Sequence, residues 1–387
     1  MTSAPSLRPR LAVFVLVILA CAAGIAGYAR HVIRQSQTPP PFAITVAASA
    51  PASAAPPPST PAAASPAASA ASIAPAAVVA SAPAPAPAPA PAASAARASL
   101  LFRSTALGES YGRVTRAWLA DPDGAREVTP LTCDRVYFAA GSGICLTADR
   151  GALTTYRAQL FDARFALRKS IDLAGPPSRA RVSPDGRKAA FTVFISGQGY
   201  AATFTTRTSI VDAISGDSIV DDLEAWPVAR DGAAFKAIDF NFWGVTFTRD
   251  GKRFYATLGT GGRTYLVQGD FASRQMRVVA DDVECPSLSP DGRRIGFKRR
   301  DTSAPGGRFL WHVAVLDLAS HQVRVLPGET RSVDDQVEWN GNDELLYAMP
   351  LDSQQSSTEQ DVWAIAADGK SPARRLARFA FSPAVSR

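Results

Sequence analysis

Residues 284–297 read ECPSLSPDGRRIGF, and this stretch predicts the fold of the chain. Two short runs suited to strands flank the tetrapeptide Ser289-Pro290-Asp291-Gly292. In such a turn Pro presets φ, Asp bonds its own backbone, and Gly accepts a positive φ. The stretch is therefore expected to form a β-hairpin.

The hairpin pattern recurs along the chain. Residues 181–191 (RVSPDGRKAAF) repeat it almost residue for residue, and residues 247–255 (FTRDGKRFY) repeat it with Arg in place of Pro. Weaker copies lie at residues 339–347, 138–146 and 381–383. A repeat of about 40–50 residues built from strands is typical of a β-propeller blade.

Both ends of the repeat region contribute to one blade. Residues 99–131 predict a blade without its first strand, and residues 378–383 match the start of a blade and then stop. A ring closed in this way leaves no sheet edge exposed. The sequence therefore predicts an all-β, six-bladed β-propeller over residues 98–387, closed by strands from both ends of the domain. Its first-strand turns are expected near Ala139, Ser183, Thr248, Ser289, Asn340 and Ser382.

One interval, the 65 residues from Ser183 to Thr248, is longer than the others. Extra residues in a repeat array are expected in loops, often on the binding face. The interval is rich in aromatic residues, which fit either an exposed contact patch or, as is more common, the core between blades. These residues are Phe240, Phe242, Trp243 and Trp226, with Pro227 beside them.

The repeats resemble the WD40-like repeats of the TolB propeller family. The resemblance rests on Ser183-Pro184-Asp185-Gly186 with Lys188 and Phe191, on residues 289–297, and on the third-strand pattern DVWAIAADG at residues 361–369. It covers residues 98–387 and implies a six-bladed fold. TolB proteins belong to the periplasmic Tol–Pal system and bind a peptidoglycan-associated lipoprotein, which implies a binding role in the cell envelope. Related propellers precede the hydrolase domain of dipeptidyl-peptidase-type enzymes, and that activity is not expected here.

The first 34 residues predict a membrane anchor in place of the α/β domain of TolB. Residues 11–29 carry no charge and are flanked by Arg10 and Arg30. At ~1.5 Å per residue this run is about 28 Å long in a helix, close to the thickness of a bilayer core. The leading interpretation is a single-pass anchor in the cytoplasmic membrane, and the alternatives are a cleaved signal peptide and a lipoprotein signal at Cys21. All three place the propeller outside the cytoplasm, in the periplasm or at the cell surface.

Residues 35–97 predict a disordered tether. This Ala-, Pro- and Ser-rich segment has no charged residue before Arg97, and residues 82–91 alternate Ala and Pro. Such a composition cannot bury a core and favours extended polyproline II. The segment fits a spacer between membrane and propeller, although low-complexity drift gives the same composition.

The charge does not favour nucleic-acid binding. The chain has a net charge of +7, four charges of which belong to Arg8, Arg10, Arg30 and Arg34. The folded part therefore keeps about +3 and shows no basic stripe. We expect a monomeric propeller with no nucleic-acid partner.

Cysteine placement agrees with an oxidising compartment. Cys133 and Cys145 flank the first hairpin, so paired strands place them opposite each other for a disulfide; the alternative is two buried thiols. Cys285 is then left as a buried free thiol or as a partner for one of them.

Alignment of the repeats predicts which residues converge at the channel mouth. The start of each innermost strand is expected at Asp134, Ser178, Trp243, Glu284, Asp335 and Ala377. The following positions are Arg135, Arg179, Gly244, Cys285, Gln336 and Arg378. The candidate binding residues are Asp134, Arg135, Arg179, Trp243, Glu284, Asp335, Gln336 and Arg378. They fit a polar funnel for a ligand, or simply the wet, polar mouth common to propellers.

The sequence favours binding over catalysis. Asp334, Asp335 and Glu338 suggest a cation site, but no calcium-loop spacing is present, and we predict neither a metal nor a cofactor. No His-Glu-x-x-His or Gly-x-Ser-x-Gly motif occurs. We therefore expect a membrane-tethered, non-catalytic binding or scaffold module for an envelope protein or polymer. The alternative is a glycan hydrolase or lyase that uses two mouth carboxylates about 5–10 Å apart.

Overall fold

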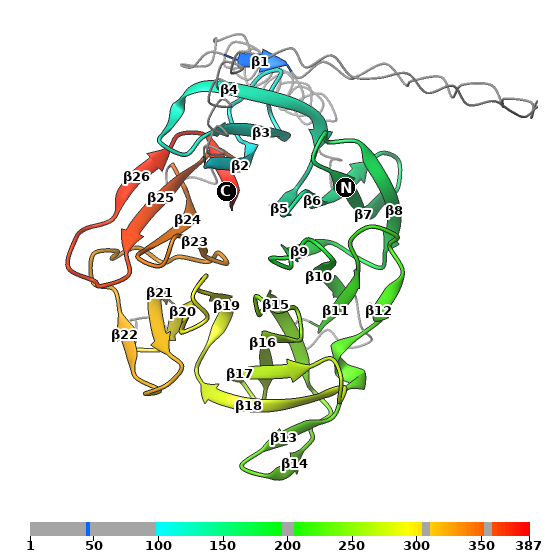
Figure 1. Cartoon of the computed structure of the whole chain (residues 1–387), viewed down its shortest axis with the longest axis vertical. Helices are drawn as coiled ribbons and strands as arrows, with labels where there is room; N and C mark the ends of the chain where they lie inside the picture. The colour runs from blue at the N-terminus through cyan, green and yellow to red at the C-terminus, as the bar shows by residue number, and fades with distance from the viewer. Residues whose placement is uncertain (1–43, 47–97, 196–204, 304–309, 352–357) are drawn as a thin grey trace, which may run out of the picture. The chain divides into compact units, whose positions relative to one another are not determined.

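The computed structural model describes residues 44–46, 98–195, 205–303, 310–351 and 358–387. Within them the strands form six sheets arranged around a central axis (Figure 1). The only helical element described is one 3₁₀ turn, η1 (Leu223–Ala225). The predicted all-β, six-bladed propeller is therefore confirmed. Residues 11–29, which the sequence predicts to cross the membrane, lie outside the described residues. Among the residues that are described, no helix is long and apolar enough to span a bilayer.

Each blade is an antiparallel sheet with its first strand innermost. Blades 1 and 2 consist of β5 (Arg135–Ala139), β6 (Ser142–Arg150), β7 (Thr154–Asp162) and β8 (Leu167–Leu173), then β9 (Pro177–Val182), β10 (Lys188–Ile195), β11 (Thr205–Asp212) and β12 (Ser218–Val220). Blades 3 and 4 consist of β15 (Asn241–Phe247), β16 (Arg253–Thr260), β17 (Arg263–Asp270) and β18 (Gln275–Asp281), then β19 (Glu284–Leu288), β20 (Arg294–Asp301), β21 (Leu310–Asp317) and β22 (Val323–Val325). Blade 5 consists of β23 (Glu338–Asn340), β24 (Glu344–Pro350), β25 (Gln360–Ala366) and β26 (Arg374–Ala377).

Blade 6 closes the ring with strands from both ends of the domain. It consists of β27 (Ala380–Ser386), β2 (Ser99–Ser104), β3 (Arg113–Trp118) and β4 (Asp121–Thr132). The inner strand β27 pairs antiparallel with β2, with Ser99 opposite Ser386. This is the closure that the sequence predicts, and it removes two unpaired sheet edges.

The Ser-Pro-Asp-Gly turns join the first and second strands of blades 2 and 4. The N–H of Gly186 donates to the Ser183 carbonyl at 2.8 Å, and Gly292 donates to the Ser289 carbonyl at the same distance. Both glycines have a positive φ, near 70°, so a residue with a Cβ is strained there. In blade 3, Gly251 donates to Thr248 in the same way, at 3.0 Å. Residues of the motif therefore serve the turn.

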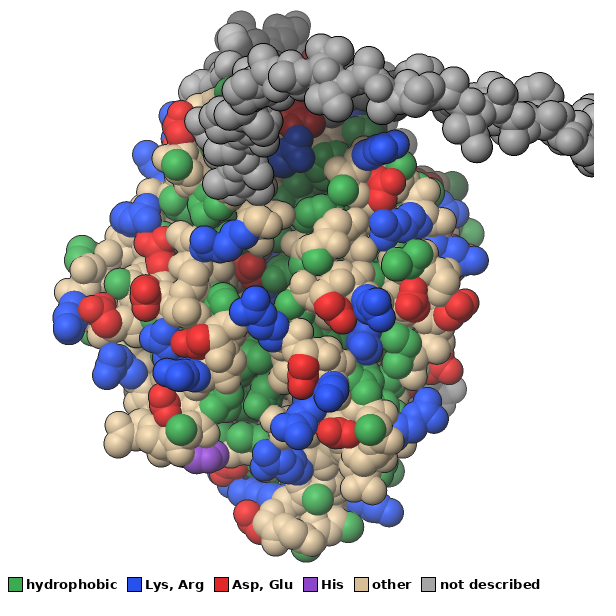
Figure 2. All heavy atoms as spheres, viewed as in Figure 1, with side chains coloured by type: hydrophobic (Ala, Val, Ile, Leu, Met, Phe, Trp, Pro, Cys, Tyr) green, Lys and Arg blue, Asp and Glu red, His purple; other side chains and the backbone are tan. Residues whose placement is uncertain are grey.

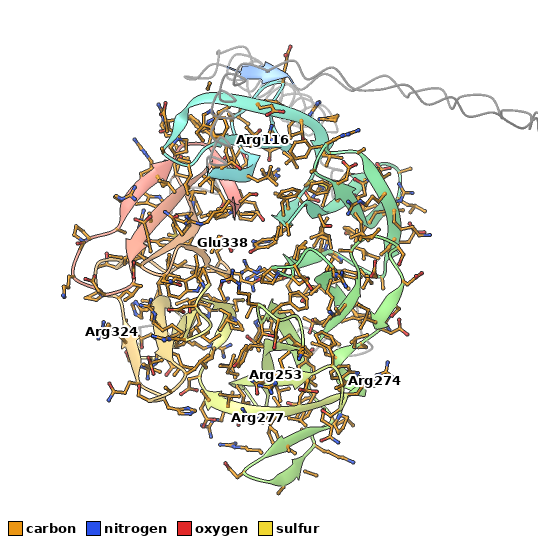
Figure 3. All side chains as sticks on the ribbon, in the orientation of Figure 1. Arg116, Arg253, Arg274, Arg277, Arg324 and Glu338 are labelled. Atoms are coloured by element: carbon orange, nitrogen blue, oxygen red, sulfur yellow. A yellow bond between two sulfur atoms is a disulfide. The ribbon has the colours of Figure 1, made fainter. Side chains whose placement is uncertain are left out.

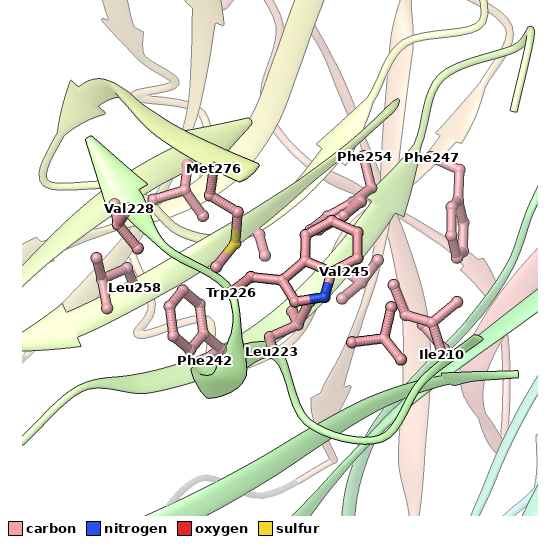
Figure 4. Close-up of a cluster of buried hydrophobic side chains, with 14 of the residues drawn as sticks. Ile210, Leu223, Trp226, Val228, Phe242, Val245, Phe247, Phe254, Leu258 and Met276 are labelled. Carbon is pink, nitrogen blue, oxygen red and sulfur yellow. The ribbon is translucent and has the colours of Figure 1, made fainter. Parts of the chain in front are cut away.

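The long interval between Ser183 and Thr248 extends blade 3 at its outer edge. It contains β13 (Val228–Arg230) and β14 (Ala233–Phe235), a hairpin in which β13 pairs parallel with β18. The loop expected on the binding face is thus a hairpin on the side of the sheet away from the axis. Trp226 and Phe242 are at most 8% exposed and belong to one core cluster, which supports the core interpretation for them. Trp243 is also 8% exposed, but it lines the pocket described below. Trp226 packs beside Phe242 and Met276 (Figure 4).

A short strand lies within the segment predicted to be a disordered tether. This strand, β1 (Ile44–Val46), pairs parallel with the outer strand β4, with Thr45 opposite Glu127. Two of its three residues are β-branched aliphatics, which suit a strand. The rest of residues 35–97 lies outside the described residues.

Cys133 and Cys145 form a disulfide, and Cys285 is a buried free thiol. The bond links the segment after β4 to β6, so it joins blade 6 to blade 1. Replacing both cysteines by Ser is expected to lower the free energy of unfolding by about 2–3 kcal/mol, because the disulfide restricts the unfolded chain by closing a loop between residues 12 positions apart. Urea unfolding of the oxidised chain and the double variant measures this. Cys285→Ser is the control for loss of a buried thiol, and a double variant as stable as the parent would contradict the expectation.

Candidate functional site

A cavity of about 670 Å³, called the mouth pocket below, lies at the end of the ring where the innermost strands begin. Six of the eight predicted binding residues line it together: Asp134, Arg135, Arg179, Trp243, Glu284 and Asp335. The first, second and third strands of several blades all have their ends here. Residues distant in sequence therefore meet at one site, as the alignment of repeats predicts.

Gln336 lies beneath the mouth pocket and does not line it. Its side-chain amide donates to the Val245 carbonyl at 3.1 Å and to the Pro286 carbonyl at 2.9 Å. Gln336 thus joins blades 3, 4 and 5 across the axis. Its role in the structure is to close the channel.

Arg378 lies outside the mouth pocket because the alignment of the last blade is shifted by four residues. Cys285 in β19 and Ser382 in β27 both have a positive φ, 50° and 56°, at a bulge of the innermost strand. The counterpart of Cys285 is therefore Ser382, and Phe381 takes the mouth position. Residues 381–383 resemble the start of a Ser-Pro-Asp-Gly turn, but no Asp-Gly follows and β27 continues to Ser386.

Sequence reasoning missed the residues that second and third strands bring to the mouth pocket. Lys298 and Arg300 come from the end of β20, and Trp311 comes from the start of β21. The signal in the sequence was two cations, Lys298 and Arg300, spaced to point to one face of a strand. Both residues lie in a second strand, whereas the repeats were compared at their first strands.

Asp335 is fixed by the protein and is not free to bind a ligand. Its side chain is 2% exposed, and Oδ1 accepts from Arg135 Nη1 at 2.7 Å and from the Gln336 N–H at 2.9 Å. Its Oδ2 accepts from the Ala348 N–H at 3.1 Å. The Arg135 guanidinium also lies 4.6 Å from the centre of the Phe381 ring. This pair holds the segment before β23 against blade 1.

Lys298 is a buried ammonium shared by two carboxylates. Its side chain is 5% exposed and its Nζ lies 3.6 Å from Glu284 Oε2 and in contact with Asp334 Oδ1. Glu284, also buried, accepts from Arg300 Nε at 2.8 Å. The Lys298 ammonium lies 4.5 Å from the centre of the Trp311 ring. The charges of this cluster are therefore compensated and held on rigid strands.

Asp334 is the exposed member of this cluster. Its side chain is 59% exposed, and Oδ1 also accepts from Arg179 Nη2 at 3.3 Å. Burial alone raises the pKa of this carboxyl, but Lys298 and Arg179 outweigh burial and hold the pKa below its ordinary value. Asp334 is thus an ionised carboxylate presented to solvent by two positioned cations.

Arg179 connects Asp334 to the inner wall of the ring. Its Nε lies 3.3 Å from Cys285 Sγ, and its Nη1 donates to the Ser178 carbonyl at 3.2 Å. Only 13% of its side chain is exposed. Packing and hydrogen bonds therefore fix the guanidinium before any ligand arrives.

Positive and negative charges balance in the mouth pocket. Four cations line it, Arg135, Arg179, Lys298 and Arg300, against four carboxylates, Asp134, Glu284, Asp334 and Asp335. Lys, Arg, Asp and Glu side chains also intermingle over the face seen in Figure 2. In the part of the chain that the structure describes, no cluster of three potential metal ligands occurs. Asp334, Asp335 and Glu338, considered together in the sequence, each pair with a cation instead.

The channel is closed between the mouth pocket and the opposite end of the ring. Arg181 and Glu338 form a buried ion pair at the axis, and Tyr137 donates to Glu338 Oε2 at 3.1 Å. Glu338 lies near the centre of the ring in Figure 3. Arg181 also donates from Nη2 to the Val337 carbonyl at 3.1 Å, and Gln336 bridges the Val245 and Pro286 carbonyls. The mouth pocket therefore does not continue through the ring as an open channel.

No protein-family model matches this sequence, and no curated protein sequence matches it. Solved structures share its fold. TolB from Acinetobacter baumannii has a TM-score of 0.51 and 18% identity, over 75% of this chain and 66% of that chain. A protein from Agrobacterium tumefaciens assigned as a TolB has a TM-score of 0.43 and 12% identity, over 72% of this chain and 88% of that chain. The chain thus matches just under two thirds of the length of the first, and residues 98–387 have a propeller fold of the TolB type.

Proposed function

We propose that this propeller is a non-catalytic binding module of the cell envelope, with a protein segment or polymer of the envelope docking in the mouth pocket. The observation that supports it is Asp334, an exposed carboxylate held between buried Lys298 and Arg179. Because these side chains are already held in place, little of their conformational freedom is lost when a ligand binds. Balanced charge also favours a partner that presents both signs.

We propose further that residues 1–34 anchor the protein to the cytoplasmic membrane and that residues 35–97 tether the propeller outside it. The disulfide between Cys133 and Cys145 fits an oxidising compartment. Residue Ser99, where β2 begins, pairs with Ser386 at the end of the ring opposite the mouth pocket. The strand β1 (Ile44–Val46) also meets the propeller, at the outer strand β4, and neither Ser99 nor β1 lines the mouth pocket, so a tether held at these two places leaves that pocket open to a partner.

The mouth pocket supports binding better than glycan hydrolysis. A glycosidase needs one carboxyl with a raised pKa as its general acid. The pKa of Asp334 is lowered instead, and Glu284 is occupied by Arg300 and Lys298. These carboxylates are arranged to hold cations in place.

Reversing the charge of Asp334 tests the proposal. Asp334→Arg places a third cation beside Lys298 and Arg179, so we expect at least about tenfold weaker capture of the envelope partner, since one charge-assisted contact is lost and a repulsion is added. The measurement is quantitative co-purification with the full-length protein after crosslinking in cells.

The matched control is Asp343→Arg, because the side chain of Asp343 is 96% exposed and lies in a turn at the other end of blade 5. This control should capture the partner as the parent does. Equal capture by the parent and both variants would contradict the proposed site.

A further inference from the structure

A second cavity, of about 480 Å³, lies at the opposite end of the ring and is called the turn-side pocket. Tyr137, Arg181 and Glu338 line it near the axis, Phe247 and Trp339 form its aromatic part, and Arg249 and Arg387 contribute cations. The Ser-Pro-Asp-Gly turns of blades 2 and 4 border it through Pro184 and Pro290. The closed section of the channel separates it from the mouth pocket, so the two pockets are independent.

The turn-side pocket differs from the mouth pocket in charge. Among the side chains that line it are three guanidiniums, those of Arg181, Arg249 and Arg387, and one carboxylate, that of Glu338. Glu338 is already bound by Arg181 and Tyr137 and accepts from the Val385 N–H at 3.3 Å. The pocket is therefore electropositive, whereas the mouth pocket is balanced.

Arg249 supplies a free guanidinium at this pocket. It is exposed and has no hydrogen bond or ion pair with any residue that the structure describes. Arg249 occupies the turn position that Pro184 and Pro290 occupy in blades 2 and 4. The turn can therefore form without an arginine at this position. The carboxylates of the neighbouring turns form no ion pair with it within the described residues, and Asp185, Asp250 and Asp291 accept hydrogen bonds within their own turns.

Arg181 offers a second donor near the axis. Its side chain is 6% exposed, and within the described part of the chain its Nε–H has no acceptor. A buried donor without an acceptor is costly, and a ligand oxygen or a bridging water removes that cost. Guanidiniums bind carboxylates with two parallel hydrogen bonds, and the aromatic and proline walls suit the apolar part of a peptide.

We propose that the turn-side pocket is a second binding site, which takes a short peptide segment through a carboxylate group. The carboxylate is either a side chain of the peptide or its C-terminus, and both present the same two oxygens to the guanidiniums. This inference does not depend on the function proposed for the mouth pocket. The two sites allow the propeller to hold two partners at opposite ends of one axis.

Fluorescence polarisation tests the site with the full-length protein in detergent. The probes are a fluorescein-labelled hexapeptide with two glutamates and its glutamine counterpart, each with a free or an amidated C-terminus. We expect the glutamate peptide with a free C-terminus to bind about tenfold more tightly than the amidated glutamine peptide, as one charge-assisted hydrogen bond implies. Loss on amidation assigns the C-terminal carboxylate, and loss on glutamine replacement assigns the side chains; each supports the proposal.

Variants of Arg249 locate the binding. Arg249→Pro restores the residue found in the other two turns and removes the charge, so it should fold normally and lose the preference for carboxylate. Arg187→Glu alters an exposed arginine in the neighbouring turn that does not line the pocket, and it should keep that preference, as should Asp334→Arg in the mouth pocket. Equal affinity for all four probes, no binding at millimolar peptide, or equal loss in the Arg249 and Arg187 variants would overturn the proposal.

Discussion

Ending the chain at Phe379 is expected to abolish cooperative folding of the propeller. The truncation removes β27, which supplies the innermost strand of blade 6. Ala380 and Ala384 of this strand belong to two different core clusters, so both lose part of their packing. The edge of β2 also becomes unpaired beside the axis. Urea unfolding followed by tryptophan fluorescence should show no sigmoidal transition for this variant.

A circular permutant separates the loss of the strand from the change in chain length. Because Ser386 lies opposite Ser99, a two-residue Asn-Gly turn can join β27 directly to β2 as a hairpin. A chain that runs from Ala380 through this turn and on to Phe379 has every blade complete. It should regain a cooperative transition. A truncated chain that unfolds like the parent would contradict the closure argument.

The second large effect is expected at the buried ion pair of Arg181 and Glu338. Removing either charge leaves its partner buried without compensation, which costs about 3–5 kcal/mol of unfolding free energy. Burial raises the pKa of Glu338 even with Arg181 beside it. The cost of removing these charges from water is therefore not fully offset by their attraction. We therefore expect the double variant, Arg181→Met with Glu338→Leu, to be more stable than either single variant. A double-mutant cycle by urea unfolding measures the coupling.

An exposed pair provides the matched control for that cycle. Arg374 Nη2 lies 2.7 Å from Glu344 Oε1, but the Arg374 side chain is 58% exposed. Solvent screens such a pair, and its coupling should stay below about 1 kcal/mol. Equal coupling energies in the two cycles would show that burial at the axis is not the cause.

The fold follows from the sequence because local signals and closure agree. Ser183 and Ser289 each begin a turn in which Pro, Asp and Gly favour the turn conformation for different physical reasons. Such a turn sets the register of the two strands that it joins. The missing first strand at one end of the domain and the extra strand at the other indicate the ring. These signals are local or depend only on strand order, so the fold could be predicted from them without coordinates.

The site could be predicted only in part because it depends on register and on neighbouring strands. Phe381 replaces Arg378 at the mouth because a bulge continues β27 where the sequence resembles a turn. Lys298 acquires its role from Glu284 and Asp334, which come from other segments. The hairpin β13–β14 pairs with β18, which no local pattern indicates. Such contacts are set by tertiary packing.

Site-specific photocrosslinking in living cells tests most directly whether the mouth pocket is the binding site. A benzophenone amino acid is placed at Pro350, an exposed residue of the mouth pocket, or at Leu167, which is 53% exposed on the outer strand β8. We predict that an envelope component is captured from position 350 and not from position 167, and that Asp334→Arg removes this capture. Capture of the same component from position 167 with none from position 350 would contradict the proposal.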